Sequence, residues 1–200
     1  LPYIGAVKAY LVLPVYAIIG PSVIATRLVS VLLGAAAIFG LGYFLWDQLG
    51  RGVALIVCTI FAIHPAYLDL TIYDNSALPV WMAAQSLALV FLAIYLRKPA
   101  VATACATGIA LGLTIWARAN IAWTIAAVFI AALLVFNRRL VVPLRHIAAC
   151  IAGGVAGCSP LLLYEYLSKG GTFEFLSASS RAIPFALIQR RLYITVEVMI

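Results

Sequence analysis

The sequence predicts an all-α polytopic membrane protein, a helix bundle of about six transmembrane helices with further helices lying at the outer interface. Hydrophobic residues make up 66% of its 200 residues, and charged residues only 10%. A soluble domain is about half apolar and about a quarter charged. No water-soluble core of this length can hide so much apolar surface, so lipid must be the solvent.

The polar composition excludes several other classes of protein. The net charge is +7, but the basic residues stand singly or in pairs at the ends of apolar runs, as in membrane loops and unlike a nucleic-acid-binding stripe. The four cysteines form no CxxC pair, and the chain has only two histidines. We therefore expect no metal site, no disulfide framework and no cofactor, although a divalent cation stays open.

Apolar runs place the individual helices, because a membrane helix needs about 20 mostly apolar residues. In lipid the backbone must satisfy its own hydrogen bonds, so each run is predicted to be helical. The predicted helices cover residues 23–46, 52–67, 78–96, 100–117, 121–136 and 142–167.

The segments on either side of this bundle are predicted to lie at the membrane surface and not to span it. Residues 1–21 contain Lys8 and Pro14, and we expect one or two helices lying in the interface. Ser22 is predicted to cap the first spanning helix. Residues 168–200 form the predicted outer-face segment, so the chain reads as a single transmembrane domain. It begins with Leu and stops within "RLYITVEVMI", and we expect a fragment of a longer protein.

Lysine and arginine in the short loops predict the orientation. One set of loops carries Arg51, Arg97 with Lys98, and Arg138, Arg139 and Arg145, and it is expected to be cytoplasmic. The alternate loops carry the two aspartates of "HPAYLDLTIYDNSALP" and Arg118. These residues, together with Lys8, are therefore predicted to lie at the outer face.

Asp69 and Asp74 in that outer loop are two of only six acidic residues in the chain. "DNSALP" reads as a helix start, with side-chain oxygens for free N–H groups and Pro79 in the first turn. Asp74 can equally be a carboxylate facing a cavity at the mouth of the bundle. Asp69 reads as a solvated loop acid, or as a second carboxylate in acid–base chemistry.

Arg118 and Lys8 are the candidate anion ligands. Arg118 lies in "WARAN" between Trp116 and Trp123, and it can be an interfacial anchor whose charge reaches the headgroups. It can also bind a phosphate, because the guanidinium is always charged and offers a forked set of donors. Lys8 carries the same two interpretations.

The order of these motifs resembles the GT-C superfamily of membrane glycosyltransferases, in particular its protein mannosyltransferase-like and aminoarabinose-transferase-like group. The run "PYIGAVKAYLVLPVYAIIGPSVIATRLVSVLLG" looks like the segment after that family's first outer loop. "YDNSALP" resembles its second outer loop, without the frequent Trp-Gly. "GLTIWARANIAW" resembles the segment with an outer Lys or Arg, and "GGTFEFL" a later outer segment.

The resemblance implies an enzyme that moves a sugar from a polyprenyl-phosphate carrier to a lipid, glycan or protein acceptor at the extracytoplasmic face, with no nucleic-acid partner. It implies catalytic roles for Asp74 and Asp69, phosphate binding by Arg118 and Lys8, and a multi-pass location in a cell membrane, expected to be the bacterial inner membrane. The family's principal catalytic acid precedes the "P-x-x-G" start, so Asp74 matches a second acidic position. A lipid transporter or flippase and a noncatalytic membrane scaffold are the alternative readings.

Overall fold

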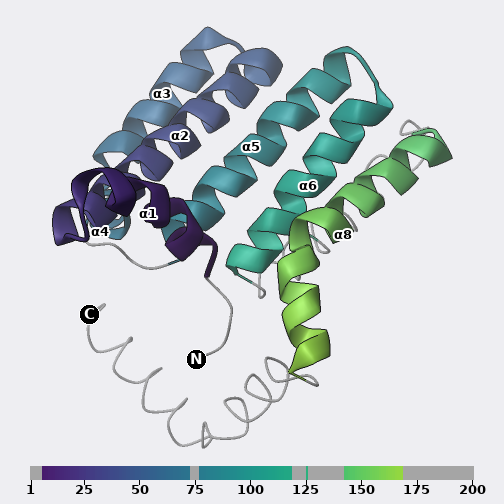
Figure 1. Ribbon diagram of the computed structural model, residues 1–200. Helices are drawn as coiled ribbons and strands as arrows, with labels where there is room; N and C mark the ends of the chain where they lie inside the picture. The colour runs from purple at the N-terminus through teal and green to yellow at the C-terminus, as the bar shows by residue number, and fades with distance from the viewer. Residues whose placement is uncertain (1–5, 73–76, 119–124, 126–141, 169–200) are drawn as a thin grey trace, which may run out of the picture. The chain divides into compact units, whose positions relative to one another are not determined.

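The computed structural model describes residues 6–72, 77–118, 125 and 142–168. These described residues are helical and contain no strand, which confirms the predicted all-α class. Figure 1 shows the helices in chain order. They are α1 (Ala6–Ile19), α2 (Val23–Leu49), α3 (Arg51–Ile63), α4 (Pro65–Ile72), α5 (Leu78–Arg97), α6 (Val101–Ala117) and α8 (Leu144–Leu167).

The chain divides into two compact units, and all but the last residues described belong to the larger, Ile4–Leu161. The smaller unit combines residues 1–3 with 162–200, of which the structure describes only 162–168, the last turns of α8 and Ser168. The groove, cavity and helix contacts described below all lie within the larger unit.

Three described helices, α2, α5 and α8, are long and apolar enough to cross a membrane. The bent pair α3–α4 raises this number to four if it is one span. The prediction of six spans is therefore not confirmed. The helix α6 has 17 residues and is shorter than the other three, and the predicted helix 121–136 lies outside the described residues.

The prediction of one continuous helix over 52–67 is wrong. The chain breaks at His64, and α3 and α4 are bent by 62° relative to each other. Pro65 explains the break, because proline has no N–H to donate and disfavours the helical conformation in the residue before it. His64 accordingly adopts φ −67° and ψ 122°, an extended conformation.

Of the segment 1–21 the structure describes residues 6–21, and these hold one helix, α1, which continues through Pro14. It ends at Gly20, whose φ of +80° suits glycine and whose N–H donates to the Tyr16 carbonyl at 2.9 Å. The next helix begins as predicted at Ser22, whose hydroxyl accepts from the Ala25 N–H at 3.1 Å. The Tyr16 hydroxyl lies 2.6 Å from Thr26 Oγ1 and ties α1 to α2.

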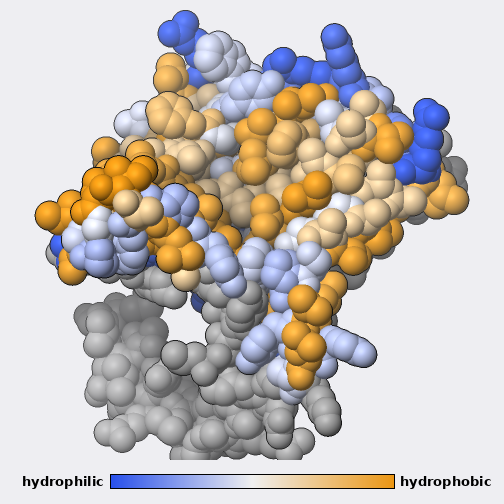
Figure 2. All heavy atoms as spheres, in the orientation of Figure 1, coloured by the Kyte–Doolittle hydropathy of each residue, from blue (hydrophilic) through white to orange (hydrophobic). Residues whose placement is uncertain are grey.

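Small side chains lie between the helices, and large apolar ones point outward. Ala25 and Ala93 are fully buried, whereas Phe39 on α2 is 78% exposed. Figure 2 shows hydrophobic side chains over the sides of the bundle and hydrophilic ones gathered near the helix ends. This arrangement fits a lipid environment, where close approach of backbones through small residues holds helices together.

The contact of α6 with α8 depends on four glycines, Gly108 and Gly112 facing Gly153 and Gly157. A Cβ added at Gly112 would lie 2.8 Å from the Cys158 nitrogen, and one at Gly157 would lie 3.0 Å from the Ile109 carbonyl carbon. These atoms are backbone and cannot move aside. The glycines spaced four residues apart in each helix therefore form one helix crossing.

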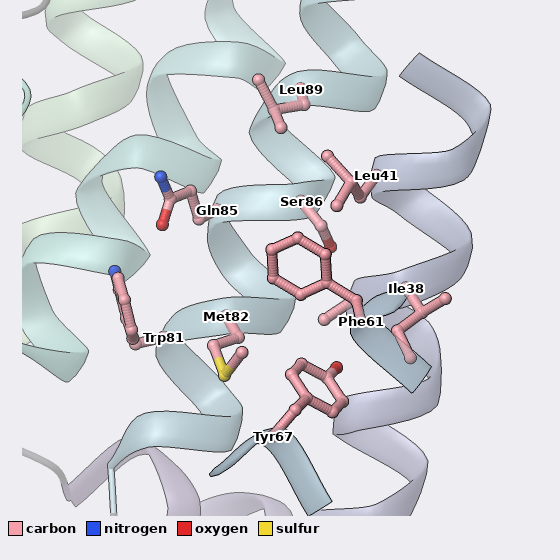
Figure 3. Close-up of a pocket in the computed structure, with 10 residues that line it drawn as sticks. Ile38, Leu41, Phe61, Tyr67, Trp81, Met82, Gln85, Ser86 and Leu89 are labelled. Carbon is pink, nitrogen blue, oxygen red and sulfur yellow. The ribbon is translucent and has the colours of Figure 1, made fainter. Parts of the chain in front are cut away.

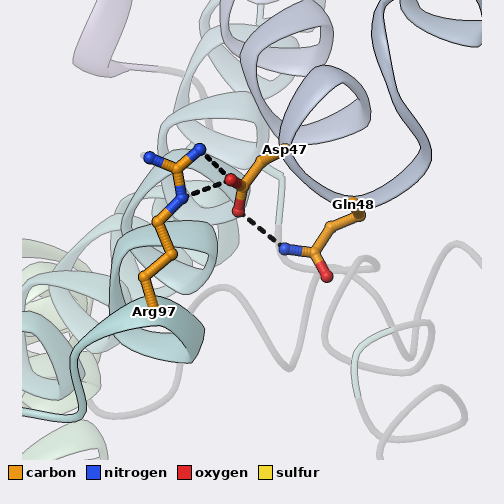
Figure 4. A network of polar contacts seen from close by, with 3 residues as sticks. All are labelled: Asp47, Gln48 and Arg97. Carbon is orange, nitrogen blue, oxygen red and sulfur yellow. Dashed lines mark hydrogen bonds and ion pairs between the residues drawn. The ribbon is translucent and has the colours of Figure 1, made fainter.

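An ion pair joins the C-terminal ends of α2 and α5. Asp47 accepts from Arg97 and from the Gln48 side chain, the latter at 2.7 Å (Figure 4). Nearby, the Tyr95 hydroxyl lies 2.9 Å from His146 Nδ1 on α8. These contacts place Arg97 and the start of α8 at one end of the bundle.

Candidate functional site

Two hollows flank α5 near the end of the bundle opposite to the Asp47–Arg97 pair. The larger, which we call the α1 groove, has a volume of about 660 Å³ and lies between α1, α2, α5 and α6. Its walls are almost wholly apolar, and they include Tyr10, Leu33, Leu87, Leu113 and Trp116. The helix α1 forms one border of the groove, which explains why a helix too short to span has an apolar inner side.

Lys8 lies in α1 between residues that border this groove. Val7 and Tyr10 line it, and the ring of Tyr10 lies 6.1 Å from the ring of Trp116 on α6. The Lys8 side chain is only 7% exposed, so burial lowers the pKa of its ammonium below the ordinary value of 10.5. The sequence placed Lys8 at the interface, and the structure places its side chain inside the protein.

The smaller hollow, which we call the α4 cavity, lies on the other side of α5 and has a volume of about 230 Å³. Figure 3 shows Trp81 and Gln85 of α5 on one wall and Phe61 of α3 and Tyr67 of α4 on the opposite wall. Ser86 lies between the walls and borders the α1 groove as well.

Two of the three hydroxyl and indole groups in the α4 cavity have partners within the protein. The Tyr67 hydroxyl donates to the Gly34 carbonyl at 2.6 Å, and the Ser86 hydroxyl donates to the Ala83 carbonyl at 2.9 Å. The Trp81 indole nitrogen is buried and makes no hydrogen bond in the part of the chain that the structure describes. An unsatisfied buried donor costs about 1–3 kcal/mol, and this nitrogen is enclosed by protein rather than facing the hollow.

Arg118 lies directly beside this cavity. The helix α6 ends at Ala117, and the Arg118 N–H closes its last turn on the Thr114 carbonyl at 3.0 Å. The guanidinium carbon then lies 6.0 Å from the centre of the Trp81 ring, within reach of a cation–π interaction. The side chain is half-buried and keeps donors for a further partner, because a guanidinium offers five N–H groups.

The predicted site residues fall into three different surroundings. Lys8 follows Val7, which lines the α1 groove, but does not line the groove itself, and Arg118 lies beside Trp81 of the α4 cavity. Asp69 is exposed on α4, two residues and about 200° around the helix from Tyr67, so it faces away from the cavity. Asp74 lies outside the described residues. Ala77 stands at the N-cap of α5 without a side-chain cap.

The sequence reading missed the residues that line the α4 cavity. A signal for two of them was present, since Trp81 and Gln85 are four residues apart in an apolar helix and therefore share one face. Gln85 is the only amide side chain in the run 78–96. The contribution of Tyr67 could not be read in the same way, because it depends on the bend at His64.

Comparison with known proteins gives no relative. The chain matches no protein-family model, no curated protein and no solved structure.

Proposed function

We propose that the protein is a membrane glycosyltransferase that moves a sugar from a polyprenyl-phosphate carrier to an acceptor at the outer face of the membrane. One observation carries the proposal: an open apolar groove of about 660 Å³ whose bordering helix holds a buried lysine. The groove offers a place for an isoprenoid tail, and the lysine offers a cation for the phosphate. The order of GT-C-like motifs in the sequence supports the same function.

The groove suits an isoprenoid chain for physical reasons. It lies among helices that already expose large apolar side chains, so a lipid tail can enter from the side. Burial of apolar surface contributes about 25 cal/mol per Å² when the alternative is water; in a bilayer the gain must come from packing against the walls. Tyr10 and Trp116 provide large side chains for such packing at the end of the groove.

Lys8 suits the phosphate because burial penalises its charge. Burial lowers the pKa of the ammonium, and a phosphate monoanion or diester beside it would favour the charged form. Arg118 offers a second cation at the same end of the bundle. In the transfer step both cations would stabilise the negative charge that develops on the departing phosphate.

The proposed chemistry is a single displacement at the anomeric carbon. A bond forms between the acceptor oxygen and the anomeric carbon, while the bond from that carbon to the phosphate oxygen breaks. The phosphate leaves with the electron pair. The proton of the acceptor hydroxyl goes to a carboxylate acting as general base, for which Asp74 and Asp69 are the candidates in this chain.

A lipid transporter is the second candidate, because one observation favours it. The helices α3 and α4 meet at a break with a bend of 62°, and broken helices are common in transporters that bind their substrate within the bilayer. The three described helices long enough to span lack an acidic residue at their centre, however, since Asp47 lies near the end of α2 and Glu165 near the end of α8.

A transfer assay distinguishes the glycosyltransferase from the lipid transporter. The full-length protein in membranes is incubated with radiolabelled polyprenyl-phosphate sugars, and the labelled acceptor is measured. Lys8→Gln, Arg118→Gln and Asp74→Asn are compared with Lys98→Gln, a loss of charge at the opposite end of the bundle. The enzyme predicts transfer that falls in the first three variants and persists in Lys98→Gln. Movement of labelled lipid between leaflets without any transfer would contradict the enzyme proposal and support the transporter.

A further inference from the structure

The crossing of α6 and α8 is locally symmetric, and a cysteine stands at the same position in each helix. Gly108 of α6 lies against the Cys150 carbonyl, and Gly153 of α8 lies against the Cys105 carbonyl. In both cases an added Cβ would collide with that carbonyl. Each cysteine precedes the glycine of its own helix by three residues. The two helices therefore exchange the same contact, cysteine carbonyl to glycine, in both directions.

The next turn repeats this exchange. Gly112 of α6 lies against the Gly154 carbonyl, and Gly157 of α8 lies against the Ile109 carbonyl. Residue numbers rise together along both helices, so α6 and α8 are parallel where they cross. In a parallel crossing of this symmetry, equivalent residues of the contact surface lie opposite each other at the same level. Cys105 and Cys150 are such an equivalent pair.

The surroundings of the thiols distinguish this pair from the other cysteines. The Cys105 and Cys150 thiols lie close enough for an electrostatic interaction between them, and both side chains are half-buried. Cys158 is buried, and Cys58 donates to the Ile38 carbonyl of α2 at 3.6 Å. All four are free thiols, so the structure describes the reduced state of the pair.

The close approach of the backbones favours a bond between the two sulfurs. A disulfide requires Cα atoms about 4.4–6.8 Å apart, whereas the axes of packed helices usually lie about 8–10 Å apart. Glycines that touch the opposite carbonyls bring these helices nearer than side-chain packing allows. Cys105 and Cys150 stand one turn from those glycines, where the separation is still small.

The pair lies near one end of the bundle. Cys105 comes four residues after the start of α6 at Val101, and Cys150 comes six residues after the start of α8 at Leu144, which is about 6 and 9 Å of helix. A small hydrophilic oxidant can reach this depth from the water at the headgroups. The same end carries Arg97 and the basic loops that predict the cytoplasmic side, where thiols are kept reduced and disulfides are transient.

We propose that Cys105 and Cys150 form a reversible disulfide that locks α8 to α6 when the protein meets a peroxide. One thiol attacks a peroxide oxygen, the O–O bond breaks, and a sulfenic acid and one water are formed. The second thiol then attacks the sulfenic sulfur, the S–S bond forms, and the hydroxyl group leaves as a second water with the thiol proton. The two sulfurs lose two electrons to the peroxide, and a dithiol reductant returns them.

The disulfide would replace a contact between glycine backbones with a covalent bond. It closes the chain between the two helices into a loop, which lowers the conformational entropy of the unfolded state. The oxidised protein should therefore unfold at a higher temperature than the reduced protein. The inference concerns only the helix crossing and does not depend on the proposed function.

The test uses the full-length protein in nanodiscs, first reduced with dithiothreitol and then treated with hydrogen peroxide. Peptide mapping without reduction identifies disulfides, alkylation counts the remaining thiols among the four cysteines, and thermal unfolding is followed before and after oxidation. Cys105→Ser and Cys150→Ser are compared with Cys58→Ser and Cys158→Ser, which make the same change at cysteines outside the pair.

The proposal predicts a disulfide between Cys105 and Cys150 within one chain, in the wild type and in both control variants. Two of the four thiols should be lost to alkylation, the unfolding midpoint should rise, and dithiothreitol should reverse both changes. Cys105→Ser and Cys150→Ser should form no disulfide within the chain and show no rise. Four free thiols in the oxidised wild type, or a disulfide between other cysteines, would overturn the proposal. A Cys105–Cys150 disulfide with an unchanged midpoint would overturn the lock.

Discussion

The Tyr67 hydroxyl donates to the Gly34 carbonyl across 2.6 Å and thereby fixes α4 against α2. Gly34 makes this possible, because the side chain of Thr71 occupies the space in which another residue would place its Cβ. The contact holds the short helix after the bend at His64, and it sets one wall of the α4 cavity.

Gly34→Ala should therefore destabilise the protein. The new Cβ would lie 2.5 Å from Thr71 Cγ2 and 3.2 Å from Thr71 Cβ, and overpacking of this kind costs about 1–3 kcal/mol. We expect a lower midpoint of thermal unfolding in detergent. Gly52→Ala is the matched control, since a Cβ there meets nothing within 4 Å in α3 and alanine favours a helix. Equal midpoints in the two variants would contradict the close contact of α4 with α2.

The crossing of α6 and α8 gives a second prediction, in which neighbouring glycines respond differently. A Cβ at Gly153 would lie 3.0 Å from the Ile109 nitrogen and closer still to the Cys105 carbonyl, whereas one at Gly154 would lie 3.7 Å from the Gly108 oxygen. Gly153→Ala should separate the helices and lower the unfolding midpoint, and Gly154→Ala should not. A scan in which Gly154→Ala is the more harmful change would show that the crossing has another register.

The Asp47–Arg97 pair predicts that Arg97 contributes more to stability than the adjacent cation, Lys98. The Asp47 side chain is 6% exposed and that of Arg97 is 58% exposed, so loss of Arg97 leaves a largely buried carboxylate without its guanidinium. Arg97→Gln should lower the unfolding midpoint more than Lys98→Gln, and Asp47→Asn should restore part of the loss. If the double variant is no more stable than Arg97→Gln alone, the ion pair does not account for the effect.

Burial of Lys8 predicts a pH dependence of stability. The folded-state pKa lies below the ordinary 10.5, so in the interval between the two values the unfolded chain binds more protons than the folded one. The free energy of unfolding must then increase as the pH rises through this interval. Wild type should gain stability relative to Lys8→Met as the pH rises toward 10.5. A constant difference between the two proteins over this range would mean that Lys8 is as well solvated as in the unfolded chain.

Local rules predicted much of this fold from the sequence. The composition predicted lipid as the solvent, Ser22 was identified as a cap, and the apolar runs gave the bounds of α2, α5 and α8 to within a few residues. The bend at His64 could have been predicted from Pro65 alone, but the long apolar run favoured one span. Tertiary contacts decided the rest, and no periodicity shows that Lys8 turns inward or that Tyr67 reaches Gly34.

The site was harder to predict for the same reason. Charged residues stood out in an apolar chain, so the sequence pointed to Lys8, Arg118, Asp69 and Asp74. The two hollows are lined mainly by uncharged residues from several helices, and they exist only once α1 and α4 are placed. Trp81 belongs to the candidate site because it lines the α4 cavity and its ring lies beside Arg118, and both relationships depend on tertiary contacts.

Binding of the carrier lipid tests the central claim most directly. A photoreactive polyprenyl phosphate is added to the full-length protein in nanodiscs, and the bound fraction is measured after crosslinking. Leu33→Trp places a larger side chain in the α1 groove, and Leu32→Trp makes the same change at the neighbouring position, which is 58% exposed and outside the groove. Our account predicts at least tenfold weaker labelling of Leu33→Trp, with Leu32→Trp labelled like the wild type. Equal labelling of all three proteins would contradict a carrier tail in the α1 groove.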